Sequence, residues 1–298
     1  MNLKWLELFC YIVEEGSLSA AGRRAYITQP SVTKYMNALE DHYGSLLLHR
    51  TNGSVSPTST GHELYAHAKR ILGEYYNSLE AVDYLETGIQ KQLIVGASYT
   101  IGEYIMPSVL VRYQQAYPDS VIHLEINNTR TILRQLDNQQ LDVAFIEGEL
   151  TDQRLMKQVI SYDDVQLVVG PAHPWAERSS VCIKELMNEK YIARESKSST
   201  RRIVERKLKE RYNEYDVTPH LELNTNQAVK NAIQSGLGYG FVSYYAVRHE
   251  IDHGLLMNVP LANCKIERPF WRVKKPLRFE KPALETFEAI VSETLQTI

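Results

Sequence analysis

The stretch from Glu15 to Arg50 constrains the fold of this 298-residue chain most strongly, because it predicts two short helices joined by a tight turn. Ser17 or Ser19 can cap the first helix, since a serine oxygen accepts a hydrogen bond from a free backbone N–H group. The small residues Ala20-Ala21-Gly22 allow another helix to approach closely. The stretch therefore predicts a compact helical unit at the N-terminus.

A second helix is expected to begin near Thr28, whose hydroxyl is a good helix cap. Pro30 suits its first turn, where the missing N–H costs nothing. We expect the turn residues Tyr26 and Ile27 to pack inward. Apolar residues then recur at spacings of three and four, which predicts one buried stripe. The stripe consists of Val32, Met36, Leu39 and Tyr43.

The opposite face of the second helix is polar. Its side chains are Gln29, Ser31, Thr33, Lys34, Tyr35 and Asn37. Such groups suit base edges and phosphates, and a helix N-terminus itself favours a phosphate. The pattern predicts a helix that lies in a groove of double-stranded DNA.

This N-terminal region resembles that of the LysR-type transcriptional regulators. The matching residues, without a gap and at the family's spacing, are Phe9, Val13, Gly16-Ser17-Leu18-Ser19-Ala20-Ala21, Thr28-Gln29-Pro30-Ser31-Val32-Thr33, Leu39-Glu40, Gly44, Leu47-Leu48, Arg50, Pro57-Thr58 and Gly61. Ala25 departs from the usual leucine, Leu48 from the usual phenylalanine and Pro57 from the usual leucine. From the residues and the resemblance together, we expect DNA contacts from Ser17, Gln29, Pro30, Ser31, Thr33, Lys34, Tyr35, Asn37 and Arg50.

The resemblance implies an α/β protein with an N-terminal all-α winged helix-turn-helix. The DNA-binding head would cover residues 1–58, a dimerising linker helix residues 59–88, and an effector-binding domain residues 89–298. That domain would be two-lobed, like a periplasmic binding protein. Lobe I would span about 89–163 and 266–298, and lobe II about 164–265.

The linker prediction also follows from the residues. Asn52-Gly53 is a hairpin turn signal, which makes a small wing. Residues 58–87 then read as one long helix with an apolar stripe, which needs a partner such as a second copy of the chain. The stripe consists of Leu64, Ala68, Ile71, Leu72, Tyr75, Leu79, Val82 and Leu85. A two-fold dimer would bind a dyad operator, and we expect it to assemble further into a homotetramer.

The balance of charges limits the ways in which the head can bind DNA. The chain has a net charge of −3, so it has no generally basic surface. In the head, Lys4, Arg23, Arg24, Lys34 and Arg50 are matched by Glu7, Glu14, Glu15, Glu40 and Asp41. Binding must therefore depend on local placement of cations, doubled in a dimer. Arg50 has two readings, a phosphate contact or an arginine tied to Glu40.

Beyond Gly88 the pattern alternates between strands and helices, which predicts a parallel-sheet α/β fold. It includes a helix over residues 103–117, a strand over 165–170 that enters the second lobe, and a return over 264–273. In such folds ligands gather beyond the carboxyl ends of strands, at helix N-termini. The candidate effector-binding residues there are Ser98, Tyr99, Thr100, Asn127, Asn128, Thr129, Glu147, Ser196, Ser198, Ser199, Thr200 and Thr225.

Helix capping explains any one of these loops, but their coincidence in both lobes favours a site for a small anion or carboxylate. Glu147 would discourage a highly charged anion unless Lys197 or Arg201 offsets it. No cofactor, metal or catalytic residue is expected.

Two other functions compete with the DNA-binding regulator. One is a solute-binding sensor whose N-terminal helices only dimerise. The other is a zinc hydrolase, because His249-Glu250-Ile251-Asp252-His253 matches H-E-x-x-H. A short surface helix explains that motif equally well.

The three cysteines, Cys10, Cys182 and Cys264, are widely spaced and form no disulfide framework, which fits a reducing cytosol. Inert thiols are expected, and a paired redox sensor is the alternative. The first residues lack the apolar run of a signal peptide, and no stretch approaches the length of a membrane span. The expected location is the cytoplasm.

Overall fold

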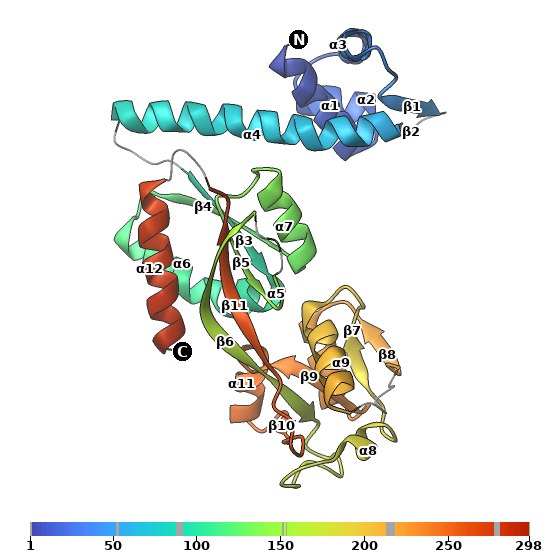
Figure 1. The fold of residues 1–298 in the computed structure, drawn as a ribbon, viewed down its shortest axis with the longest axis vertical. Coiled ribbons are helices and arrows are strands. Elements are labelled where there is room, and N and C mark those ends of the chain that lie inside the picture. The colour runs from blue at the N-terminus through green and yellow to red at the C-terminus, as the bar shows by residue number, and fades with distance from the viewer. Residues whose placement is uncertain are drawn as a thin grey trace. The chain divides into compact units, whose positions relative to one another are not determined.

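The computed structural model describes residues 2–51, 54–87, 92–150, 152, 154–212, 218–276 and 281–297. The chain divides into two units, one made of Met1–Gln90 with Asp137–Gln140 and the other of Lys91–Leu136 with Leu141–Ile298. In the first unit, short helices and a hairpin precede a long helix (Figure 1). Its elements are α1 (Leu3–Glu15), α2 (Leu18–Arg24), α3 (Gln29–Tyr43), β1 (Leu48–Thr51), β2 (Ser54–Pro57) and α4 (Ser59–Thr87).

The predicted close helix packing of the head is confirmed. Gly16 ends α1 in the left-handed region, and the Ser17 hydroxyl accepts the Ala20 N–H at 3.3 Å to begin α2. A Cβ atom on Gly22 would lie 2.9 Å from the carbonyl oxygen of Ile27, so only glycine fits there. Antiparallel pairing of Thr51 with Ser54 confirms the wing, although Asn52-Gly53 lies outside the described residues.

Four predictions for the recognition helix need correction. Tyr26 is 96% exposed, because its left-handed backbone (φ 57°) turns the side chain outward. Tyr43 is 41% exposed, although Val32, Met36 and Leu39 are buried as predicted. Tyr35, which was placed on the polar face, packs partly against the core of the head.

The fourth correction concerns Thr28. It stands at the N-cap position of α3, but its hydroxyl makes no capping bond to the backbone. It lies instead 3.0 Å from the Ser31 hydroxyl. The predicted cap residue is thus joined to Ser31, a side chain of the predicted DNA face.

The long helix α4 has two different halves. Leu64, Ala68 and Leu72 are buried in the core of the head. The apolar stripe continues beyond it, but Leu79, Val82 and Leu85 are 49%, 55% and 78% exposed. The second half therefore presents apolar side chains that the described residues of the head leave uncovered, as a helix awaiting a partner does.

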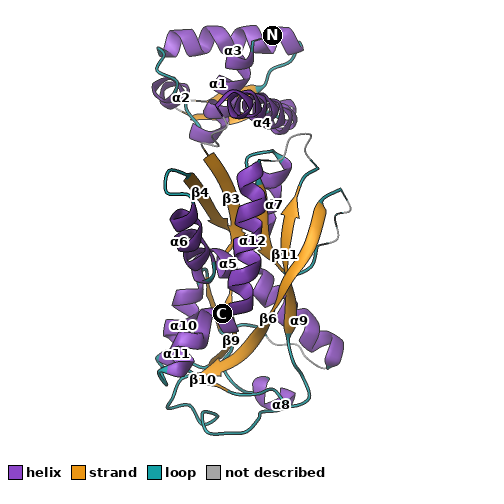
Figure 2. Cartoon of the chain, turned by 90° about the vertical axis from the view of Figure 1, so that its left-hand side faces the viewer, coloured by secondary structure: helices purple, strands orange, loops and turns teal. Residues whose placement is uncertain are grey.

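The second unit consists of two lobes joined by two long strands (Figures 1 and 2). Lobe I contains β3 (Gln92–Ser98), α5 (Tyr99–Tyr104), α6 (Met106–Ala116), β4 (Val121–Asn127), α7 (Thr129–Asp137), β5 (Val143–Glu147) and α12 (Pro282–Thr297). Lobe II contains α8 (Ile183–Leu186), β7 (Ile192–Arg194), α9 (Ser199–Arg211), β8 (Leu221–Leu223), α10 (Asn226–Gln234), β9 (Tyr239–Ser243), α11 (Tyr244–Asp252) and β10 (Met257–Asn258). The joining strands are β6 (Met156–Val169) and β11 (Glu267–Lys274).

Helices cover both faces of the sheet in each lobe. In lobe I, α5, α6 and α12 pack on one face of the sheet, and α7 packs on the other (Figure 1). In lobe II, α8 and α9 contribute to one core and α10 and α11 to another. Strands buried on both faces read as continuous apolar runs, and Leu93 to Ala97 in β3 is such a run.

The sheet is mixed rather than purely parallel. Strands lie in the order β10, β6, β11, β5, β3, β4, and β9 also pairs with β6. β3 runs parallel to β4 and β5, whereas β11 is antiparallel to both β5 and β6. The reason is that β6 leaves lobe I and β11 returns to it, so these neighbours must run in opposite directions.

Two element predictions were also inaccurate. The helix predicted over residues 103–117 is two helices, α5 and α6, since Pro107 stands in the first turn of α6. A proline is accepted there, but it cannot continue a helix that started earlier. The strand predicted from Val165 begins earlier, at Met156. Its first half is partly exposed and lacks a strong apolar pattern, so the sequence did not indicate it.

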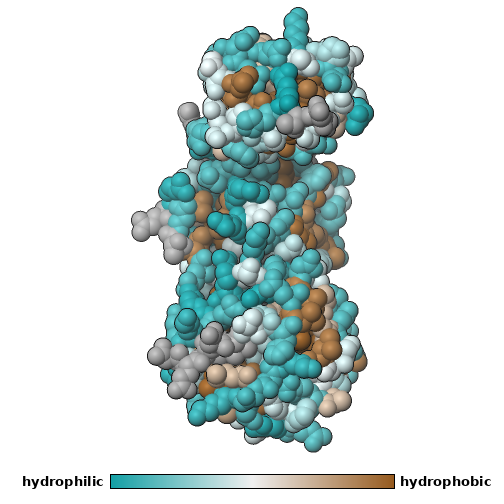
Figure 3. All heavy atoms as spheres, turned by 90° about the vertical axis from the view of Figure 1, so that its right-hand side faces the viewer, coloured by the Kyte–Doolittle hydropathy of each residue, from teal (hydrophilic) through white to brown (hydrophobic). Residues whose placement is uncertain are grey.

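Polar residues predominate on the face shown in Figure 3, where apolar residues form separate patches. Such a surface is ordinary for globular domains. Among the described residues, no helix combines the length and the hydropathy needed to cross a bilayer.

Candidate functional site

The predicted DNA-binding side chains of α3 differ in their exposure to solvent. Gln29, Lys34 and Asn37 are exposed on α3, whereas Ser31 and Thr33 are partly buried. The Ser19 hydroxyl donates to Oε1 of Gln29 at 2.7 Å, which orients that amide. Within the described part of the chain, Lys34 has no ion-pair partner, so its ammonium is available to a phosphate.

Ser17 and Arg50 have structural roles as well as predicted DNA contacts. Ser17 caps α2. Arg50 donates to Asn37 at 3.1 Å and to Glu40 at 3.2 Å. It is therefore paired with Glu40, as the second of the two interpretations predicts. The Glu40 carboxylate also accepts the backbone N–H groups of Leu47 and Leu48, which fixes the approach to the wing.

Two of the acids that oppose the cations of the head, Glu7 and Glu14, are bound to the protein itself, whereas Asp41 is exposed on α3. Glu14 accepts from Arg24 at 2.8 Å and from Lys69 at 2.9 Å. Burial by itself raises the pKa of Glu14, but the contacts from Lys69 and its other donors outweigh this and hold the pKa below its ordinary value. Glu7 accepts from Tyr76 at 2.9 Å. These carboxylates join α1 to α4 and do not lie on the α3 face, which is how a head with balanced charge can still present a local cation to DNA.

In the second unit, two predicted effector residues, one from each lobe, contact the side chain of Arg268. The sequence analysis did not single out this arginine. Arg268 is 1% exposed and lies on β11. Its Nη2 donates to Thr100 of lobe I at 3.0 Å, and its Nη1 donates to Thr200 of lobe II at 2.8 Å. Its Nε donates to Asp163 of β6 at 2.7 Å. We call these four residues the Arg268 cluster.

Glu147 lies beside the Arg268 cluster. Its Oε1 accepts the Ser199 hydroxyl at 2.9 Å and lies 3.7 Å from Nη1 of Arg268, while its Oε2 has no hydrogen-bond partner among the described residues. Burial raises the pKa of Glu147, against the opposing effect of the Arg268 charge. Neither Lys197 nor Arg201, the two cations considered above, offsets the charge of Glu147. Arg201 pairs with Glu205 and Glu222, and Lys197 is exposed, so Arg268 supplies the positive charge.

The remaining predicted effector residues divide into two groups. Ser98 is fully buried, and within the described ranges its Oγ has no hydrogen-bond partner. Thr129 donates to the Glu147 carbonyl at 3.4 Å. The Tyr99 ring lies 5.1 Å below the Arg194 guanidinium. The others cap helices or turns, or are exposed: Asn127, Asn128, Ser198 and Thr225 accept backbone N–H groups, and Ser196 is exposed.

The missed residues Asp163, Ser243 and Arg268 lie on or beside the joining strands. Ser243 donates to the second oxygen of Asp163 at 2.8 Å. One signal was present in the sequence. Alternation along β11 puts Arg268 on the same face as the buried residues Ile266 and Phe270, and a charge at such a position requires a partner.

Comparison with known proteins decides the family. The descriptions "LysR substrate binding domain" and "Bacterial regulatory helix-turn-helix protein, lysR family" match residues 86–296 and 3–62. The chain belongs to the LysR family of transcriptional regulators. A probable RuBisCO transcriptional regulator of Emiliania huxleyi is 31% identical to this LysR-family chain over 304 residues, which cover 99% of the chain and 96% of that relative.

Solved structures of LysR regulators share the fold. Full-length CbnR in complex with its target DNA has a TM-score of 0.72 at 19% identity, and the match covers 99% of this chain and 100% of CbnR. The regulatory domain of CcmR from Synechocystis PCC6803, in complex with 2-PG, has a TM-score of 0.64 at 24% identity. That match covers 70% of this chain and 99% of the CcmR domain.

Membership of the LysR family overturns the zinc hydrolase alternative, and the geometry explains the H-E-x-x-H motif differently. Glu250 accepts from the buried Lys230 at 2.5 Å, so its carboxylate is engaged within lobe II. His253 stands at the end of α11 with its Nδ1 2.8 Å from the His249 carbonyl. The described residues contain no group of three ligands suited to a metal.

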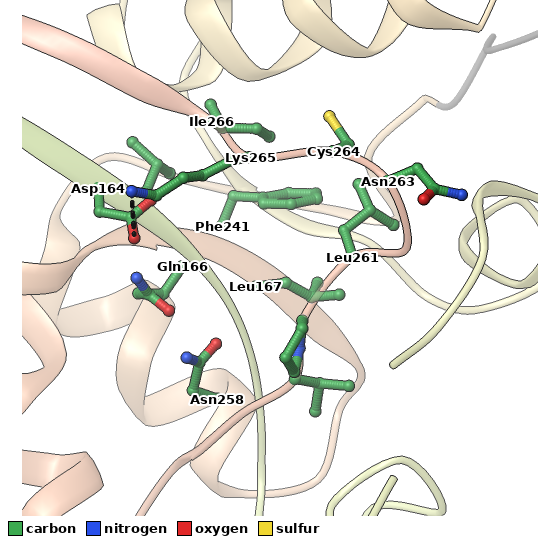
Figure 4. Close-up of a pocket in the computed structure, with 13 residues that line it drawn as sticks. Asp164, Gln166, Leu167, Phe241, Asn258, Leu261, Asn263, Cys264, Lys265 and Ile266 are labelled. Carbon is green, nitrogen blue, oxygen red and sulfur yellow. Dashed lines mark ion pairs between the residues drawn. The ribbon is translucent and has the colours of Figure 1, made fainter. Parts of the chain in front are cut away.

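A hollow of about 470 Å³ lies in lobe II, between β6 and the segment that follows β10 (Figure 4). Phe241 and Leu167 line it together with Gln166, and Lys265 lies 3.9 Å from Asp164 at its edge. None of its lining residues belongs to the predicted effector loops, so it is separate from the Arg268 cluster.

The cysteines show no paired redox site in the described part of the chain, where all of them are free. Burial raises the pKa of Cys10 to about 12, which leaves it a thiol at neutral pH. Cys264 lines the lobe II hollow, and burial raises its pKa as well.

Proposed function

We propose that this LysR-family chain is a cytoplasmic one-component regulator whose α3 reads a dyad operator in double-stranded DNA. The observation that carries the proposal is the polar face of α3, where Gln29, Lys34 and Asn37 are exposed while Glu7 and Glu14 of α1 are engaged by α2 and α4. Amide groups suit base edges, and a lysine suits a phosphate. Ser17, Pro30, Ser31, Thr33, Tyr35 and Arg50 complete the proposed interface.

The exposed apolar half of α4 supports assembly. Leu79, Val82 and Leu85 would be covered by the α4 of a second copy, which gives a dimer whose two heads match a dyad site. We propose that two such dimers form a homotetramer. The interlobe region would bind a small anion or carboxylate, and CcmR, which has the same fold, was solved with 2-PG. The effector would act by preferring one relation of the lobes over another.

Replacement of Ser31 and Lys34 by alanine tests the DNA assignment. Loss of Lys34 removes one phosphate contact from each head, so the slope of log affinity against log salt should fall by about two for a dimer. Specific operator binding should be lost in gel-shift titrations with DNA that flanks the chain's own gene. Sedimentation should show an unchanged oligomer.

The matched control replaces Ser179 and Lys184, a hydroxyl and an exposed ammonium in lobe II, by alanine. This pair should bind the operator like the wild-type chain. Equal operator affinity and equal salt slope in the wild type and the Ser31/Lys34 variant would count against α3 as the recognition helix.

A further inference from the structure

The Arg268 cluster joins both lobes to the joining strands through a single side chain. The guanidinium touches Thr100 at the start of lobe I helix α5, Thr200 at the start of lobe II helix α9, and Asp163 on β6. Its side chain has no exposed surface. Separation of the lobes must therefore break at least one bond to Arg268.

The edge of the guanidinium that faces the lobes is the edge that normally binds an anion. Nη1 and Nη2 of an arginine form a fork that fits the two oxygens of a carboxylate or phosphate. Here the fork holds two uncharged hydroxyl oxygens, one from each lobe, at 2.8 and 3.0 Å. Hydrogen bonds to an anionic oxygen are roughly twice as strong as those between neutral groups. The threonine pair thus occupies the place of an oxyanion, and the Glu147 carboxylate beside it lies farther away, with its Oε1 3.7 Å from Nη1.

A hollow of about 350 Å³ lies next to this arginine, although the Arg268 side chain itself has no exposed surface. Its lining comes from lobe I, from α9 and from β11, and it includes Arg268 itself. Arg206 and Lys207 of α9 also line it, and Arg206 forms an ion pair with Glu149 of lobe I. Glu149 and Glu267 line the hollow as well, so these two cations are matched by two carboxylates.

We propose that Arg268 is both the latch of the ligand-free cleft and the receptor for the effector, whose oxyanion displaces the Thr100 and Thr200 hydroxyls from the guanidinium fork. The displacement releases lobe I from lobe II while Asp163 keeps the arginine in place. The proposal rests on the proposed effector site and specifies its ligand class, a carboxylate or phosphate with two oxygens able to reach one arginine.

Thr100→Val and Thr200→Val test the proposal, because valine keeps the shape of threonine and removes the hydroxyl that competes for Arg268. Thr294→Val is the matched control, since Thr294 is also buried and accepts from Arg112 at 3.0 Å, but within lobe I. The full-length variants are compared with the wild type by hydrogen exchange and by calorimetric titration with inorganic phosphate.

Both cleft variants should exchange the backbone amides of α5 and of the first turn of α9 several-fold faster than the wild type. They should also bind phosphate several-fold more tightly, because one competitor for the fork is gone. Thr294→Val should match the wild type in both measurements. Arg268→Lys, which keeps the charge and loses the fork, should bind phosphate more weakly.

Weaker phosphate binding by the valine variants would show that the threonines hold the anion themselves, and it would overturn the displacement. Unchanged exchange in α5 and α9, or no phosphate binding by the wild type, would overturn the proposal as well. Operator binding is measured separately with the Ser31/Lys34 variant. A wild type that binds its operator but fails the phosphate test therefore refutes only this inference, and the reverse result refutes only the proposed DNA binding.

Discussion

The recognition helix and the interlobe cleft both carry polar side chains, but they differ in what those side chains touch. On α3, Gln29, Lys34 and Asn37 are exposed, so a partner meets side chains that are mostly hydrated. In the cleft, Arg268 and Asp163 are buried and already paired with protein atoms. A ligand of the head would displace water, whereas the ligand proposed for Arg268 would displace part of the protein.

This difference bears on how such a chain can be regulated. A contact that replaces water leaves the protein structure much as it was. A contact that replaces a protein–protein bond changes which atoms hold the lobes together, and only such a differential interaction can shift a conformational equilibrium. The cleft is therefore the region of this chain suited to switching, and α3 is the region suited to reading.

The largest expected effect is the difference in stability lost when an arginine is replaced in the cleft and in the head. Arg268→Met leaves Asp163 buried without its partner, and removal of one member of a buried ion pair costs about 3–5 kcal/mol. Arg50→Met removes a partly exposed pair with Glu40 and should cost about 1 kcal/mol or less. Urea unfolding followed by tryptophan fluorescence measures both. Equal losses would remove the distinction between a buried and an exposed arginine.

A second prediction concerns Glu40, a carboxylate of the head that is buried and hydrogen-bonded to protein atoms, as Asp163 is in the cleft. Glu40 is buried, and its Oε1 accepts the backbone N–H groups of Leu47 and Leu48. Glu40→Ala should lower the free energy of unfolding by about 1–3 kcal/mol, because it leaves buried donors unpaired. Glu40→Gln keeps an acceptor at this place and should lose less in the same urea titration. If the alanine variant is as stable as the glutamine variant, the backbone contacts contribute nothing.

The smallest expected effect concerns Glu14 and Glu147, whose contributions to stability should change with pH in opposite directions. The pKa of Glu14 is lowered in the folded head, so its contribution is present above the unfolded value near 4.5 and is lost as pH falls through the folded pKa. Glu14→Gln should therefore reduce stability at neutral pH, by up to about 1 kcal/mol, and the reduction should fade in acid.

Glu147 should behave in the opposite way. Burial raises its folded pKa, so the favourable contribution exists below the unfolded value near 4.5 and is lost as pH rises through the folded pKa. Glu147→Gln should gain stability over the wild type as pH rises towards neutrality. Thermal unfolding of both variants between acid and neutral pH gives the two differences, and curves of the same sign would contradict the contrast.

The sequence was most informative where a local pattern decides the structure. The apolar stripe of α3, the serine cap of α2 and the strand–helix alternation of the second unit depend on residues close together in the chain, and the structure confirms them. The exposed polar face of α3 follows from the same periodicity, since a helix that buries one stripe must expose the other.

Prediction failed where distant segments decide the outcome. The antiparallel course of β11 beside β5 and β6 comes from the path of the chain between the lobes, and no local pattern encodes it. Tyr26 reads as an apolar turn residue, yet its backbone conformation turns it into solvent. In the loops, capping residues and cleft residues have the same composition, so Ser198 and Thr200 could not be told apart.

The sequence by itself determined the helix-turn-helix head, the linker helix and the loops that carry small polar residues in each lobe, because helix periodicity and capping act over a few residues. Only the tertiary structure decided that Arg268, Asp163 and Thr200 meet, since strands β6 and β11 and helix α9 are brought together by folding across about a hundred residues of chain. The charge of the cleft depends on that meeting. What a buried arginine can bind depends on the residues around it, and the tertiary structure determines which residues these are.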